Sequence, residues 1–197
     1  MEGSIDSSFF TAQKDLFASG LVAEIGVNAY AVWGAIKFYA NHTTGEAWPG
    51  LREIGSKIGV SQQTAMRAVE VLQKAHLLRI VDKAQFKKKG PTYIARERLT
   101  VRIGDLVLCT LVIDYVPAKL KDKVTQLKKA LEKGEHSPGL WTEVEIIPGA
   151  GFEWNEQSKT LKALLSTEYI QASQETETDE FLGNVALNFS KKMLAKK

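Results

Sequence analysis

The sequence predicts an α+β fold with a helical first part, a basic β-hairpin and a C-terminal extension rich in β-structure. Three observations predict it. Apolar residues recur at helical spacing through most of residues 23–76, β-type segments follow from residue 77, and the run LVLCTLVIDYV (106–116) is almost continuously apolar. The composition, 44% hydrophobic and 25% charged, is that of an ordinary globular protein and excludes collagen-like, mucin-like and wholly disordered chains.

The first expected elements are an arm and a helix. Residues 1–22 predict an N-terminal arm, frayed at its start, in which residues 9–22 form either a short helix or an ordered segment. Residues 23–40 predict one helix, which ends in the turn-forming residues 41–45. The apolar positions of this helix are Ile25, Ala29, Val32, Trp33, Ile36 and Tyr39.

Two further helices are expected on either side of the sharp turn Gly59-Val60-Ser61. The first spans residues 50–58, with Pro49 suited to its first turn. The second runs from Ser61 to about residue 76, and the Ser61 hydroxyl can cap it by accepting a hydrogen bond from an amide one turn in. Its buried face is predicted to consist of Ala65, Ala68, Val69, Leu72 and Ala75.

A basic hairpin follows these helices. Residues 77–81 and 93–96 predict two strands, and the loop DKAQFKKKGPT joins them. These elements follow the order of a winged helix-turn-helix: two helices, a sharp glycine turn, a third helix and a basic hairpin. Gly55, four residues before Gly59, suits the point where the third helix crosses, and Val60 suits the space between the two helices. A plain αα-hairpin in another fold is the alternative.

Positive charge is concentrated in this part of the chain. Residues 51–102 carry twelve Lys or Arg against four Asp or Glu, whereas both flanking segments are net acidic. Such a distribution is typical of a nucleic-acid surface, although a solvated lysine-rich face would look similar. We therefore expect the protein to bind double-stranded DNA.

The geometry of a winged helix assigns roles to particular side chains. The second helix of the motif lies in the major groove and reads base edges with its N-terminal turns. The expected base-reading residues are Ser61, Gln62, Gln63, Thr64, Met66 and Arg67. The expected phosphate and wing contacts are Arg52, Lys57, Lys74, Lys87, Lys88 and Lys89.

A family resemblance adds to this interpretation. The winged-helix module shared by GntR-type regulators and by phage and plasmid replication proteins resembles one segment of this chain, GEAWPGLREIGSKIGVSQQTAMRAVEVLQKAHLLRI. The preceding LVAEIGVNAYAVWGAIKFYANHTTGEAWP is more similar to the replication branch, and YIARERLTVRIGDLVLCTLVIDYV resembles small plasmid initiators. The resemblance covers roughly residues 20–116. It implies replication initiation on a plasmid or other mobile element.

The rest of the chain is expected to form an extension and a tail. We divide the sequence into an arm (1–22), a winged helix-turn-helix domain (23–102), an α/β extension (103–170), and an acidic linker with an amphipathic tail (171–197). The extension contains a buried strand (106–116), a helix (118–133) and a strand (141–147), an order that suggests a βαβ-like unit, which either packs on the wing or pairs two subunits. The tail helix needs a covering surface: its own chain, a second copy, or a replication or transcription partner.

Catalytic and metal sites find little support in the sequence. Cys109, the only cysteine, lies within an apolar run and is expected to be a core thiol. His42, His76 and His136 lack metal-ligand spacing, and no phosphate-binding glycine loop is present. We expect no enzymatic activity, no cofactor and no bound metal.

The sequence also predicts where the protein is located and what its biological role is. No apolar run approaches the ~18–20 residues of a membrane span, and the N-terminus lacks a signal-peptide pattern, so we expect a cytoplasmic protein without membrane contact. Replication initiation is the main functional hypothesis, and a GntR-like transcriptional regulator is the alternative. A third hypothesis is an assembly protein whose winged helix docks protein rather than DNA.

Overall fold

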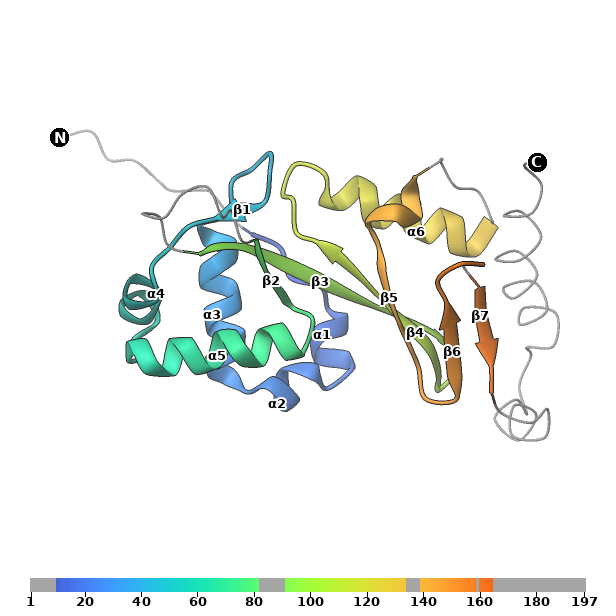
Figure 1. Cartoon of the computed structure of the whole chain (residues 1–197), viewed down its shortest axis with the longest axis horizontal. Helices are drawn as coiled ribbons and strands as arrows, with labels where there is room; N and C mark the ends of the chain where they lie inside the picture. Colours follow the sequence, from blue (N-terminus) through green and yellow to red (C-terminus); the bar gives the residue numbers. More distant parts are fainter. Residues whose placement is uncertain (1–9, 82–90, 134–138, 159, 165–197) are drawn as a thin grey trace. The chain divides into compact units, whose positions relative to one another are not determined.

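The computed structural model describes residues 10–81, 91–133, 139–158 and 160–164 (Figure 1). The fold is a mixed α+β fold, as the sequence predicted. The strand pairs across residues 106–147 are antiparallel, so the βαβ-like unit that the sequence also suggested there does not form. The chain forms two compact units. Unit 1 comprises Met1–Glu97 and Asp114–Leu120, and unit 2 comprises Arg98–Ile113 and Lys121–Lys197. The chain passes from one unit to the other three times: within β3 (Thr92–Ile103), at the end of β4 (Leu106–Asp114), and after Leu120.

Five helices belong to unit 1 in the described part of the chain. They are α1 (Asp15–Ala18), α2 (Leu21–Ile25), α3 (Val27–Phe38), α4 (Leu51–Ile58) and α5 (Gln62–Lys74). The expectation of one helix over residues 23–40 is wrong, because Gly26 interrupts it. Gly26 has φ 83° and ψ 158°, an extended conformation with positive φ that only glycine adopts readily, and it separates α2 from α3.

The core of unit 1 lies where α3, α4 and α5 pack on one another (Figure 1). Each helix contributes the apolar face that its periodicity predicts. Val32, Ile36, Ile54, Ala65 and Leu72 have no measurable exposure to solvent. Packing of this kind fixes α5 relative to α4, so the outer face of α5 is presented by a rigid support.

The turn between α4 and α5 forms as predicted. Gly59 ends α4 in the left-handed conformation with φ 76°, and the Val60 N–H donates to the Gly55 carbonyl at 2.9 Å. The Ser61 hydroxyl accepts from the Thr64 N–H at 3.1 Å and thereby caps α5. A Cβ atom on Gly55 would lie 2.6 Å from the Val60 carbonyl oxygen, so the expected requirement for a small residue at position 55 is confirmed.

Three strands of unit 1 lie beside these helices. β1 (Glu46–Ala47) and β2 (Leu78–Val81) both pair antiparallel with β3, which lies between them, at Tyr93 and Ile94. The predicted antiparallel pair of strands after α5 is therefore confirmed. The return strand β3 is longer than expected. The loop that joins β2 to β3, including residues 82–90, lies outside the described residues.

Unit 2 begins with the second half of β3, from Arg98 onward, and contains β4 up to Ile113. The predicted buried strand is confirmed, since residues 108–113 of β4 are all buried, and the predicted helix is present as α6 (Leu120–Lys133). β5 (Glu145–Pro148) pairs antiparallel with β4. The strand expected at 141–147 is wrong in its first half, because Leu140–Glu143 form a 3-10 turn, η1, that follows the left-handed Gly139.

A separate two-stranded sheet completes the described part of unit 2. β6 (Phe152–Asn155) pairs antiparallel with β7 (Thr160–Ala163). None of the described helices is long and apolar enough to cross a membrane. The tail, residues 171–197, lies outside the described residues.

Candidate nucleic-acid interface

Helix α5 has two chemically different faces. Its inner face carries Ala65 and Ala68, which are 0% and 4% exposed and let the helix approach its neighbours closely. Its outer face at the N-terminal end carries Gln62, Gln63, Met66 and Arg67, all exposed. Met66 is 43% exposed and adds an apolar group to this face. The first two turns of α5 therefore present amide, thioether and guanidinium groups to solvent.

The other two predicted base-reading residues have a local role. The Ser61 and Thr64 hydroxyl oxygens lie 2.9 Å apart, and Ser61 also accepts from the Thr64 N–H. The start of α5 thus occupies much of the hydrogen-bonding capacity of both side chains. Their structural contribution is to fix the first turn, from which Gln62 and Gln63 project.

The predicted phosphate contacts divide into three groups. Arg52 and Lys57 are exposed on α4, and Lys74 is exposed in the last turn of α5. The Lys57 ammonium lies 5.1 Å from the centre of the Phe38 ring, a cation–π contact that restrains it. Lys87, Lys88 and Lys89 lie outside the described residues.

An arginine–aspartate cluster in unit 1 was not anticipated from the sequence. Asp114 accepts from Arg79 of β2 at 2.5 Å and lies 3.4 Å from Nε of Arg96 of β3. Asp114 therefore partly neutralises two of the basic residues that give this region its charge. Sequence reasoning had no signal for this cluster, because its three members are far apart in the chain.

A buried ion pair is the second unanticipated feature. The Lys37 ammonium lies 2.5 Å from the Glu97 carboxylate, and both side chains are fully buried. The ammonium also donates to the Thr11 carbonyl and lies 4.0 Å from the ring centres of both Trp33 and Tyr115. Burial lowers the pKa of Lys37 and raises that of Glu97, and each partner's charge opposes the shift. The pair has no access to solvent, so we assign it a structural role.

Burial suppresses the reactivity of the Cys109 thiol. Cys109 is buried in β4, and burial raises the pKa of its thiol to about 12, so the nucleophilic thiolate is scarce at neutral pH. Its expected place in the core is confirmed. No group of three His, Cys, Asp or Glu side chains that could hold a metal ion occurs among the described residues.

Comparisons of the chain with protein-family models, curated proteins and solved structures gave no match. The exposed N-terminal turns of α5 are the feature with the clearest chemical capability.

Proposed function

We propose that residues 23–102 form a winged helix-turn-helix that binds double-stranded DNA with sequence specificity. The observation that carries the proposal is the exposure of Gln62, Gln63, Met66 and Arg67 on α5, a helix held by a tight turn against α4. The order of elements supports the proposal further, because it matches the helices, turn and hairpin of a winged helix-turn-helix. The elements follow one another as α3, β1, α4, α5, β2 and β3, and β3 lies between the other two strands.

The chemistry of these side chains suits base edges in the major groove. A glutamine amide can bond N6 and N7 of adenine together, and an arginine guanidinium can bond O6 and N7 of guanine. Met66 can contact a thymine methyl group. Arg52, Lys57 and Lys74 would contact phosphates, which position the protein without reading sequence.

The biological role that we propose is replication initiation on a plasmid or other mobile element, and the resemblance of residues 20–116 to plasmid initiators supports it. Footprinting of the full chain on DNA upstream of its own gene tests the role. Protection of several direct repeats beside an AT-rich stretch supports initiation. Protection of one short operator that overlaps a promoter supports the transcriptional regulator instead. Salt-independent retention on DNA, or no retention, contradicts both.

Replacing a recognition glutamine should weaken specific binding alone. We expect Gln62→Ala or Gln63→Ala to cost ~1–3 kcal/mol on the cognate site and little on random DNA, because base contacts supply discrimination. Titrations of labelled cognate and random duplexes at one salt concentration measure both values. Gln73→Ala, an exposed glutamine near the other end of α5, is the matched control and should change neither. Equal losses on both duplexes would mean that these glutamines do not read bases.

The lysines of the predicted wing should contribute nonspecific affinity. We expect Lys87→Ala, Lys88→Ala and Lys89→Ala together to reduce the slope of log K against log salt by roughly 1–2, at ~0.9 for each phosphate that the variant no longer neutralises. Three consecutive lysines cannot all face one side of the DNA backbone, so the reduction should stay below the value for three phosphates. A control with Lys121, Lys129 and Lys133 of α6 changed to Ala removes the same charge from unit 2 and should leave the slope unchanged. An unaltered slope in the wing variant would place the wing away from DNA.

A further inference from the structure

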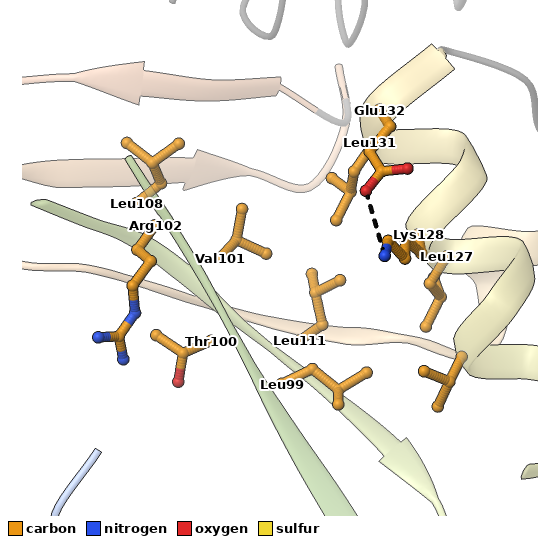
Figure 2. Close-up of a pocket in the computed structure, with 11 residues that line it drawn as sticks. Leu99, Thr100, Val101, Arg102, Leu108, Leu111, Leu127, Lys128, Leu131 and Glu132 are labelled. Carbon is orange, nitrogen blue, oxygen red and sulfur yellow. Dashed lines mark ion pairs between the residues drawn. The ribbon is translucent and has the colours of Figure 1, made fainter. Parts of the chain in front are cut away.

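Unit 2 contains an apolar groove between the strands β3 and β4 and the helix α6. Its volume is about 320 Å³, and aliphatic side chains from both strands and from the helix line it (Figure 2). Its apolar lining includes Leu99, Val101, Leu108, Leu111, Leu127 and Leu131. Leu108, Leu111 and Leu127 are nearly inaccessible to solvent, whereas the other three are only partly covered. The described residues thus leave an apolar groove with a buried floor and an open mouth.

Two basic residues, Arg102 and Lys128, and one acidic residue, Glu132, line the groove beside its apolar residues. Lys128 lines the groove, pairs with Glu132 at 3.6 Å, and keeps 72% of its side chain exposed. Lys121, Lys129 and Lys133 are further exposed lysines on α6. An occupant with an apolar face and adjacent acidic residues would complement both properties of the site.

The tail of the same chain has this combination. Phe181, Val185 and Phe189 follow one another at intervals of four residues, so they share one face of the helix that the sequence predicts. The preceding segment 171–180 contains four acidic residues and no Lys or Arg. Recognition of a helix in a groove typically uses apolar anchors at such spacings. The groove also lies at the lower end of the ~300–1,000 Å³ range of small-molecule pockets, a size that suits a few side-chain anchors.

The chain length between the groove and these anchors is sufficient. Leu164 is the last described residue, and residues 165–180 can span up to ~50 Å when extended. The segment starts close to the groove: the Leu164 N–H donates to the Gly151 carbonyl, and the nearby Gly149 N–H donates to the carbonyl of Leu108, which lines the groove. The connecting segment is therefore long enough to bring Phe181 to the groove of its own chain.

We propose that residues 181–197 bind in the apolar groove of the same chain, with Phe181, Val185 and Phe189 facing the leucines and the acidic segment 171–180 beside the lysines of α6. This proposal is independent of DNA binding by unit 1. It also assigns the covering surface that the amphipathic tail requires.

Hydrogen exchange of the full chain tests the contact. Phe181→Ser with Phe189→Ser should speed the exchange of α6 amides at least about threefold, because an uncovered helix opens locally more often. Leu187→Ser with Leu194→Ser removes two large apolar side chains from the opposite helical face and should leave α6 exchange unchanged. Equal exchange of α6 in the two double variants and the unaltered chain would overturn the proposal.

A disulfide test distinguishes the same chain from a second copy. We expect Leu131→Cys with Val185→Cys to oxidise to an intrachain disulfide, seen as a monomer on a non-reducing gel and as a linked peptide pair in mass spectrometry. Leu131→Cys with Leu187→Cys is the control and should remain mostly reduced. Interchain disulfides, or linkage that rises with protein concentration, would show docking on a second copy and overturn the proposal. Failure of both pairs to form would overturn it as well.

Discussion

Glu97→Gln is expected to lower the free energy of unfolding by ~3–5 kcal/mol, because it leaves a buried ammonium without its counter-charge. Lys37 and Glu97 are both fully buried and 2.5 Å apart. The neighbouring Trp33 and Tyr115 rings attract the ammonium but do not replace a full negative charge. Lys37→Met should have a similar cost, since it leaves the carboxylate unpaired. Urea denaturation at neutral pH, followed by circular dichroism, measures the change.

The double variant is the decisive control. Lys37→Met with Glu97→Gln removes both charges, so its loss should be much smaller than the sum of the two single losses. A strictly additive double variant would show that the two charges do not depend on each other. Single losses below ~1 kcal/mol would show that the site readily admits water when one partner is absent.

Gly55→Ala is expected to destabilise the protein by ~1–3 kcal/mol, the usual cost of an overpacked site. This sign is unusual, because alanine in place of glycine within a helix ordinarily stabilises by ~0.5–1 kcal/mol. The reason is the 2.6 Å approach of the new Cβ to the Val60 carbonyl oxygen, a backbone atom that cannot move without opening the turn before α5. Because the same turn positions Gln62 and Gln63, we also expect weaker binding to cognate DNA.

Gly34→Ala provides the matched control on α3. A Cβ at Gly34 would meet only the outer edge of the Phe10 ring, at 3.4 Å, which is ordinary contact. This variant should therefore be as stable as the unaltered protein or up to ~1 kcal/mol more stable. Thermal unfolding of the two variants in parallel shows whether each substitution lowers or raises the stability of the protein. A stabilised Gly55→Ala variant would contradict the close crossing of the turn and α4.

The α4–α5 segment could be predicted in detail because local chemistry determines it. Gly59 supplies the left-handed residue that ends α4, and Ser61 supplies the cap of α5. Alanines at 65 and 68 mark the closely packed face. Each signal acts within about one helical turn, so the sequence contains all the information needed. The exposed candidate site on α5 follows directly from this periodicity.

The errors occurred where periodicity gave no information about a break. Apolar spacing continues from Ile25 to Ala29, and nothing in it shows that Gly26 adopts a positive φ and divides the helix. The alternation of polar and apolar residues likewise predicted a strand over residues 141–147, whereas residues 140–143 form a 3-10 turn. In both cases a glycine conformation decided the boundary, and glycine tolerates helix, turn and extended backbone with little local preference.

The sequence by itself determined α4 and α5, the turn between them, the buried strand β4, and the side chains that α5 exposes. Only the tertiary structure decided which polar groups are buried together. Lys37 lies four residues after the buried Trp33 on α3 and therefore shares its face. Glu97 lies two residues after Ala95 and four after Tyr93 on β3, so it shares the face of these two buried residues. Their sequence positions are 60 residues apart. A charge on an inward face is favourable only if a partner meets it there, and that meeting depends on how a helix and a strand pack, which no local pattern encodes.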